Sequence, residues 1–294
     1  MSFVSHKGLF LLVMVGGLLG CTPSVSDVDR LEWPEMGTVA ALSFRGISTK
    51  QQGILIENVR TVYQRISEKL NAWNPESELS RLTTTNDWRE HVSSDVVPCY
   101  EAAFGLMEES RGAFNPLLAA MLREKGFTRR SALVDLGGIA KGFAVDCAYE
   151  SVQGKNVGRP SVLIDLGGNL RACGGEWHIG IRNPFGSGLC ARVLLRSGEA
   201  LATSGTYERG GHILDGRTGK TAESGLASVT VLASTALLAD GLSTTLFVLG
   251  EHAGHQFLAD YYPTVGAFFV RLDGTTASVG LDDRFLNETG WTRE

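Results

Sequence analysis

A double glycine followed by a lysine is the first feature of this sequence that could do chemistry. Gly137 and Gly138 precede a segment with helical periodicity, and Lys141 falls in its first turn. Backbone N–H groups at a helix start attract anions, glycine lets a phosphate approach closely, and lysine adds a positive charge. The pattern is neither GxxxxGK[ST] nor GxGxxG, so a phosphate site and a packing turn are both compatible with it.

A carboxylate and a hydroxyl stand four positions apart further along the chain. Asp240 and Thr244 lie in a segment that predicts a helix from its cap Ser234 to Leu249, ended by Gly250. Both side chains then project from one face, and both are hard oxygen donors that suit Mg²⁺ better than zinc. The rest of this helix is apolar and an unpaired buried carboxylate is costly, so an aspartate paired with a lysine or a backbone amide is the alternative.

A third set of reactive residues follows a Ser/Thr/Gly turn. His212 stands three positions before Asp215, which is compatible with a general base beside an orienting acid, or with a structural histidine. Ser204 is a weak candidate for a hydrolase nucleophile because the GxSxG pattern is missing.

The elements that must position these residues follow from apolar periodicity. Helices are predicted over residues 51–70 and 97–111, from Leu79, after Gly138 and from Ser234. Strands are predicted over residues 36–44, 131–136, 161–166, 177–181, 191–195, 200–203 and 228–233, and again from residue 267. Residues 131–136 and 161–166 are each followed by two glycines and lie 30 positions apart, about one strand–helix–strand unit. The mixture predicts an α+β fold with mixed or antiparallel sheets and flanking helices in one main domain.

Composition and cysteine spacing exclude several classes of protein. The 294 residues are 43% hydrophobic and 20% charged, which is typical of a globular domain. A net charge of -5 without basic runs argues against nucleic acid as a partner. Four cysteines, at positions 99, 147, 173 and 190, show no CxxC spacing, so zinc or thioredoxin chemistry is not expected. Buried thiols are the default interpretation, with disulfide pairing left open.

The first residues predict export and lipid anchoring. Lys7 precedes an apolar stretch over residues 8–19, too short for a membrane span and of the right length for a signal peptide. The stretch ends in Leu-Leu-Gly-Cys21, which resembles a bacterial lipobox, with an ordinary signal peptide as the alternative. We therefore predict a lipoprotein signal peptide (1–20), a tether (21–32) and the main domain (33–294), on a membrane-anchored lipoprotein that faces the periplasm or the cell exterior.

Taken together, these segments resemble the ApbE-like family of FAD:protein FMN transferases over nearly all of the mature chain. The segments that carry the resemblance are Met36-Gly37-Thr38, Trp73-Asn74-Pro75, the run from Ser77 to Leu82, Gly112 to Pro116, Val134 to Asp146, Ile164 to Asn169, Trp177 to Pro184, Thr203-Ser204-Gly205, His212 to Gly219 and Ala239 to Gly250.

The resemblance implies roles for particular residues. The FAD site would be lined by Met36, Trp73, Ala113, Phe114, Asn115, Asp135, Lys141 and Ile213. Mg²⁺ would be held by the Gly138 carbonyl, Asp240 and Thr244. His212 would be the base for the acceptor hydroxyl, with Asp215 nearby, and Lys141 would add positive charge at the pyrophosphate.

The activity implied is Mg²⁺-dependent transfer of FMN from FAD to a threonine of an acceptor protein, with release of AMP. Acceptors would be exported redox proteins, such as subunits of sodium-pumping NADH:quinone reductase or of RNF-type complexes. An FAD pyrophosphatase that yields FMN and AMP is one alternative, and a non-catalytic flavin-binding lipoprotein is another.

The sequence departs from the family's usual pattern at several positions. Asn115 replaces an aspartate, Thr206 stands where an acidic or amide residue is usual, Gly211 where a second histidine often stands, Gly216 where proline does, and Thr83 where an asparagine does. The Lys141, His212, Asp240 and Thr244 positions match the pattern. The departures bear on acceptor choice and on the balance between transfer and hydrolysis.

Overall fold

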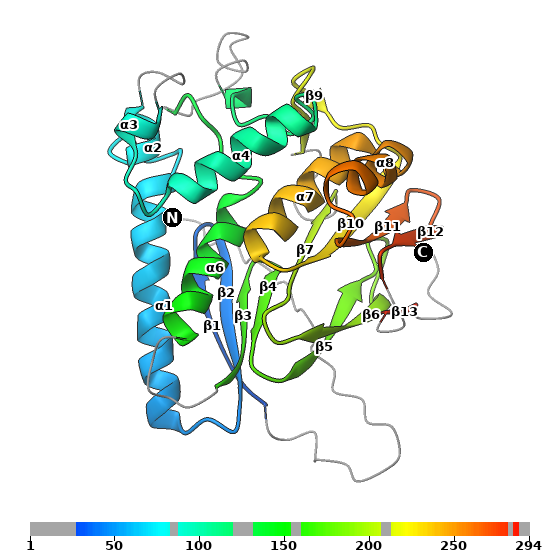
Figure 1. The fold of residues 1–294 in the computed structure, drawn as a ribbon. Coiled ribbons are helices and arrows are strands. Elements are labelled where there is room, and N and C mark those ends of the chain that lie inside the picture. The colour runs from blue at the N-terminus through cyan, green and yellow to red at the C-terminus, as the bar shows by residue number, and fades with distance from the viewer. Residues whose placement is uncertain are drawn as a thin grey trace, which may run out of the picture.

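The computed structural model describes residues 28–82, 88–119, 132–153, 160–206, 213–281 and 285–287. In these ranges a large antiparallel sheet lies between a layer of helices on one face and a smaller sheet on the other (Figure 1).

The strands pair throughout in antiparallel fashion. Those of the large sheet are β1 (Val28–Glu35), β2 (Thr38–Arg45), β3 (Ser161–Leu166), β4 (Asn169–Cys173), β7 (Ala200–Gly205), β10 (Leu226–Ala233), β11 (Gly266–Arg271) and β12 (Thr276–Val279). Among the described residues they form eight strands in the order β1-β2-β3-β4-β7-β10-β11-β12. The smaller sheet has the order β13 (Phe285–Asn287), β6 (Leu189–Arg196) and β5 (Glu176–Arg182), and β8 (Leu214–Asp215) pairs with β9 (Lys220–Thr221). All eight residues of β10 are buried, because layers cover both faces of the large sheet.

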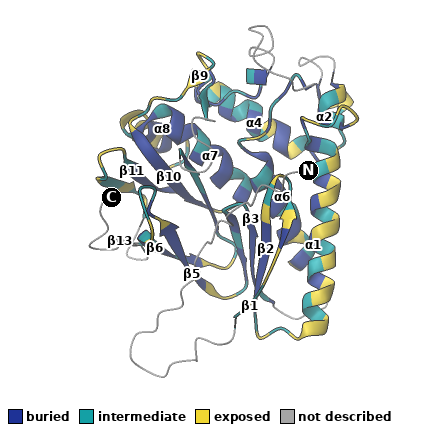
Figure 2. Cartoon of the chain, turned by 180° about the vertical axis from the view of Figure 1, so that it is seen from behind, coloured by how far each residue is buried: buried dark blue, intermediate teal, exposed yellow. Residues whose placement is uncertain are grey.

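The helices lie on the opposite face of the large sheet and beyond one end of its strands, and those over residues 140–153 and 236–249 make most of the contacts with the sheet (Figures 1 and 2). The helices are α1 (Thr49–Leu70), α2 (Glu78–Arg81), α3 (Trp88–His91), α4 (Val97–Glu109), α6 (Ala140–Gln153), α7 (Ala236–Leu249) and α8 (Glu251–Tyr261). The helix α7 contacts β7 and β10 as well as α4, α6 and α8. Its central place explains why it is apolar nearly all round, and it fixes the positions of Asp240 and Thr244.

The predicted α+β class is confirmed, but the predicted strand over 131–136 is wrong for the residues described there. Residues 132–136 form no strand, although Ala132, Val134 and Leu136 are buried. The chain is held instead as a buried loop, in which Asp135 N donates to Pro116 O at 2.7 Å. Alternating burial therefore mimicked a strand, and the expected strand–helix–strand unit is absent, since β3 pairs with β2 and β4.

Three predicted boundaries also change. Residues 28–32 of the predicted tether belong to β1, which pairs along its length with β2 and looks polar because much of this edge strand is exposed. The strand predicted from Met36 begins at Thr38, because Met36 and Gly37 both have positive φ and make the turn between the two strands. The cap of α7 is Thr235, not Ser234, since the Thr235 hydroxyl accepts from Leu238 N at 3.2 Å.

The remaining expectations concern the thiols and the membrane. The four cysteines in the described residues are free, and Cys99, Cys173 and Cys190 are buried. Burial raises the pKa of the half-buried Cys147 thiol to about 11, so it stays protonated at neutral pH. None of the helices in the part of the chain that the structure describes has the length and apolar character of a membrane span. The predicted signal peptide and Cys21 lie outside the described residues.

Candidate active site

Two cavities that share one wall lie at the start of α6. The smaller has a volume of about 260 Å³ and the larger about 510 Å³. Asp135, Gly137, Lys141 and Gly167 line both of them. The two cavities therefore adjoin at this wall.

Asp240 is the buried carboxylate of the smaller cavity, with a residue exposure of 4%. Its Oδ2 accepts from Gly142 N at 2.8 Å, and its Oδ1 lies 3.4 Å from Lys141 Nζ. Both partners come from α6, so the sequence alternative of a paired aspartate is part of the arrangement. The two contacts compensate the burial of the carboxylate without removing it from the cavity wall.

Three kinds of hard oxygen line this cavity. Thr244 Oγ1 lies 3.3 Å from the Gly138 carbonyl oxygen, and Asp240 adds its carboxylate. Neighbouring ligands of an octahedral Mg²⁺ at its usual bond lengths are about 3 Å apart, so the carbonyl and hydroxyl oxygens fit one cation. The described residues contain no group of three or more His, Cys, Asp or Glu that could hold a metal. A cation here would depend on a carbonyl, a hydroxyl and one carboxylate, as the sequence predicts.

The helix start offers less to an anion than the sequence suggested. Gly137 N donates to Asp135 Oδ1 at 2.9 Å, and the N–H groups of Ile139 and Ala140 both donate to the Leu136 carbonyl. These N–H groups are therefore already engaged. Lys141, which lines both cavities, is the cationic group on the shared wall.

The predicted FAD-binding residues divide between the two cavities. Met36 and Trp73 line the larger one, and Trp73 is 66% exposed. Ala113, Phe114, Asn115 and Ile213 line the smaller one. Asp135 and Lys141 line both, so the structure places all eight predicted residues around two cavities that share a wall.

The predicted acid–base pair is described in part. His212 lies outside the described residues. Asp215, in β8, accepts two hydrogen bonds from Arg217. Its Oδ1 accepts from Nε at 2.9 Å, and its Oδ2 accepts from Nη2 at 2.7 Å. These hydrogen bonds hold the pKa of the Asp215 carboxyl below its usual value. The Asp215 carboxylate is ionised and engaged by Arg217, and its role beside His212 stays a prediction.

Four polar or small residues of this region escaped prediction as site residues. Gly142 donates to Asp240, and Asp146 accepts from the first N–H groups of α7, Ala236 N and Leu237 N, both at 2.8 Å. Ser204, considered only as a nucleophile, and Ser243 contact each other beside Thr244. The sequence signal for Gly142 and Asp146 was their place in the segment that follows Lys141 on α6.

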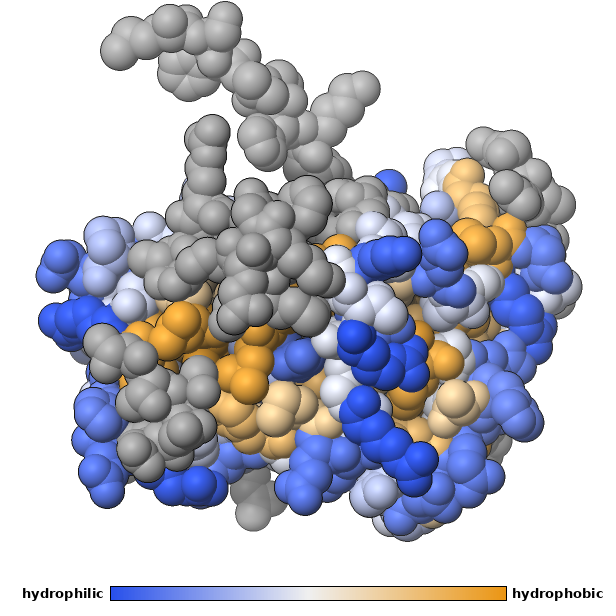
Figure 3. Space-filling model, turned by 90° about the horizontal axis from the view of Figure 1, so that it is seen from above, coloured by the Kyte–Doolittle hydropathy of each residue, from blue (hydrophilic) through white to orange (hydrophobic). Residues whose placement is uncertain are grey.

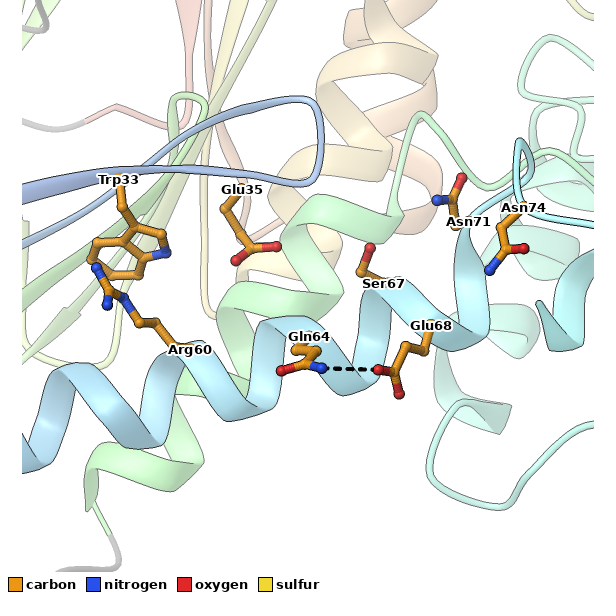
Figure 4. Close-up of a pocket in the computed structure, with 8 residues that line it drawn as sticks. All are labelled: Trp33, Glu35, Arg60, Gln64, Ser67, Glu68, Asn71 and Asn74. Carbon is orange, nitrogen blue, oxygen red and sulfur yellow. Dashed lines mark hydrogen bonds between the residues drawn. The ribbon is translucent and has the colours of Figure 1, made fainter. Parts of the chain in front are cut away.

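A third cavity, of about 400 Å³, opens between β1 and α1 (Figure 4). It shares Ser67 and Asn71 with the larger cavity. Its wall is polar, and Gln64 donates to Glu68 at 3.0 Å within it. None of the predicted site residues lines it.

At the end of the molecule that carries α2, α3 and β9, hydrophobic side chains lie in the middle of the face among hydrophilic ones (Figure 3).

Comparison with known proteins identifies relatives of the chain. Residues 36–133 and 122–269 match the model of the ApbE family. The FAD:protein FMN transferase of Haemophilus influenzae is 27% identical, over 83% of this chain and 87% of the relative. The FAD:protein FMN transferase of Treponema pallidum is 29% identical, over 78% and 80%.

Solved structures agree in fold. The ApbE protein from Thermotoga maritima superposes with a TM-score of 0.72 and 25% identity, and the match covers 85% of this chain and 96% of the other. The flavin transferase ApbE from Vibrio cholerae gives a TM-score of 0.70 at 22% identity, over 86% and 97%.

Proposed function

The chain belongs to the ApbE family, and we propose on this premise that it transfers FMN from FAD to a threonine hydroxyl of an acceptor protein and releases AMP. The observation that carries the proposal is the grouping of Asp240, Thr244 and the Gly138 carbonyl in the smaller cavity, beside Lys141 on the wall that the two cavities share. The smaller cavity therefore combines hard oxygens with a cationic side chain, which is what an anionic pyrophosphate and its counterion need. Relatives named FAD:protein FMN transferase over most of this chain's length support the same activity.

The two cavities suit the two parts of FAD. The pyrophosphate would lie along the shared wall, where Lys141 neutralises part of its charge and holds it in place. Trp73 and Phe114, in different cavities, offer aromatic faces to planar rings on either side. Lys141 would then be a positioning and charge-stabilising group rather than a nucleophile.

We assign a bound Mg²⁺ to the Gly138 carbonyl, Asp240 and Thr244, where it would supply charge neutralisation for the pyrophosphate. In the transfer, the acceptor oxygen forms a bond to the phosphorus on the riboflavin side. The bond from that phosphorus to the bridging oxygen breaks, and AMP leaves with the bridging oxygen. His212 would take the proton of the acceptor hydroxyl, with Asp215 close in sequence. If water replaces the acceptor, the same bond changes yield free FMN and AMP.

The location of the protein is also a proposal. The apolar stretch over residues 8–19 and the lipobox-like segment that ends at Cys21 support export and lipid anchoring. Residues 21–27 would then separate the anchor from β1. Exported redox proteins with an exposed threonine would be the acceptors.

The test measures AMP release from FAD by the purified protein, with and without Mg²⁺ and with a threonine-bearing acceptor, beside Asp240→Ala. Mg²⁺-dependent AMP release with flavin bound covalently to the acceptor, both lost in the variant, is the expected result. AMP with only free FMN would instead indicate a pyrophosphatase. FAD binding without AMP release would indicate a flavin carrier and refute catalysis.

A further inference from the structure

A chain of three hydroxyl groups connects Thr244 to the backbone of its own helix. Thr244 Oγ1 lies 3.4 Å from Ser204 Oγ on β7, and Ser204 Oγ lies 2.8 Å from Ser243 Oγ. Ser243 Oγ donates in turn to the Asp240 carbonyl oxygen at 2.9 Å. Ser243 is fully buried, so its hydroxyl is shielded from bulk solvent.

Each hydroxyl of this chain has one proton to donate, and the two serine hydroxyls can share a proton in either direction, whereas the Asp240 carbonyl can only accept. When Ser243 gives its proton to the Asp240 carbonyl, it can only accept from Ser204. Ser204 then gives its proton to Ser243, and toward Thr244 it can only accept. Thr244 therefore has two acceptors within reach for its proton, the Gly138 carbonyl at 3.3 Å and Ser204 at 3.4 Å.

A cation between the Gly138 carbonyl and Thr244 would remove the first of these acceptors. A hydroxyl that ligates a metal turns a lone pair to it, and its proton must point elsewhere. A carbonyl that ligates the same metal is no longer a good place for that proton. Ser204 is the acceptor that remains.

We propose that Ser204, oriented by Ser243, is a positioning residue that accepts the Thr244 hydroxyl proton so that Thr244 Oγ1 can face a divalent cation beside the Gly138 carbonyl. The inference rests on the cation site of the proposed function and extends it by one layer of residues. Ser204→Ala removes the acceptor. Ser243→Ala frees the Ser204 proton to point at Thr244, where it competes with the cation for a lone pair.

The experiment titrates the full-length protein with Mn²⁺, without FAD or acceptor, and measures free Mn²⁺ by its electron paramagnetic resonance signal. We expect Ser204→Ala to raise the Mn²⁺ dissociation constant about tenfold. Ser243→Ala should also raise this constant. Ser204→Thr keeps a hydroxyl and should therefore retain wild-type affinity. The matched control is Thr230→Val, because the Thr230 hydroxyl makes a similar 2.9 Å pair with Thr203 on the neighbouring strand. The variant removes a partly buried hydroxyl pair that lies outside the chain from Thr244 to Ser243, so it should leave Mn²⁺ affinity unchanged.

The outcomes separate this inference from the proposed function. Unchanged Mn²⁺ affinity in Ser204→Ala, or an equal loss in Thr230→Val, would overturn the positioning role, even if the wild type releases AMP and labels an acceptor. A wild type that binds no Mn²⁺ would overturn the inference together with the cation site. A wild type whose Mn²⁺ affinity depends on the Ser204 hydroxyl but which never cleaves FAD would refute only the proposed activity.

Discussion

The side-chain nitrogen of Asn115 donates a hydrogen bond of 2.9 Å to the carbonyl oxygen of Gly216. The bond joins the turn that lines the smaller cavity to the β8–β9 hairpin, and Gly216 N donates back to Ala113 O at 3.1 Å. These are two of the positions where the sequence departs from the family's usual aspartate and proline. An aspartate could not donate to Gly216 O, and a proline could not donate to Ala113 O. The two departures are therefore joined by direct contact in this chain.

Replacing Asn115 by aspartate should weaken this junction. The carboxylate keeps the bond that Asn115 Oδ1 accepts from Leu117 N at 2.9 Å but turns an acceptor toward the Gly216 carbonyl. We expect Asn115→Asp to lower the free energy of unfolding by about 1–3 kcal/mol and to weaken binding of the anionic FAD, because the added negative charge lies in the smaller cavity. Urea unfolding and FAD titration measure both effects. Equal stability of the variant and the wild type would show that the bond to Gly216 contributes nothing.

Gly142 is confined between α6 and α7. A Cβ built there would lie 2.1 Å from Ala236 O and 2.7 Å from Asp240 Cβ. Gly142→Ala should therefore push the helices apart, lower the free energy of unfolding by about 1–3 kcal/mol and weaken metal binding through the displaced Asp240 carboxylate. The control is Gly105→Ala in α4, where an added Cβ would meet nothing within 4 Å. This variant should raise the free energy of unfolding by roughly 0.5–1 kcal/mol, because alanine loses less conformational freedom in a helix than glycine does. Urea unfolding measures both variants. If Gly142→Ala has the same free energy of unfolding as the wild type, the close contact of α6 with α7 at Gly142 is not needed for stability.

Trp73 stands on the wall of the larger cavity with 66% of its surface exposed. An aromatic face with little burial in the protein is available to stack on a planar ring. Trp73→Ala should raise the FAD dissociation constant about tenfold. Trp73→Phe keeps an aromatic ring, so its dissociation constant should lie between those of Trp73→Ala and the wild type. Titration followed by flavin fluorescence measures all three. Thermal unfolding without FAD should not change, since little packing is lost. If Trp73→Ala binds FAD as tightly as the wild type, the flavin does not stack on Trp73.

The parts of the fold that local pattern determines were predicted well. The helix α1 buries Leu55, Val59, Tyr63, Ile66 and Leu70 at helical spacing, and its periodicity alone located it. The strand prediction over residues 132–136 failed because alternating apolar residues indicate alternating burial, and a buried loop can show the same alternation as a strand. Pairing with a neighbouring strand decides between the two, and no local pattern contains that information.

The same limit applies to the site. Asp240 and Thr244 were found because four positions along one helix bring two side chains together. The contacts of Asp240 with Gly142, 98 positions away, and of Ser204 with Thr244, 40 positions away, depend on how α6, α7 and β7 pack. These contacts supply the hydrogen-bonding layer behind the oxygens. Family resemblance named residues that line the two cavities, and three-dimensional packing was needed to show which residues lie behind them.

The ion pair of Asp215 with Arg217 should make part of the stability depend on pH. Hydrogen bonds from Arg217 lower the pKa of the Asp215 carboxyl from its usual value of 3.8. A carboxyl whose pKa is lower in the folded state stabilises that state above its unfolded pKa, and the contribution is lost as pH falls through the folded pKa. Asp215→Asn should therefore lower the free energy of unfolding at pH 7 by at most about 1 kcal/mol, since Arg217 is 45% exposed and water screens the pair. Urea unfolding of both proteins from pH 7 downward should show the difference narrowing below pH 3.8. A difference that stays constant across this range would mean that the Asp215 charge does not stabilise the hairpin.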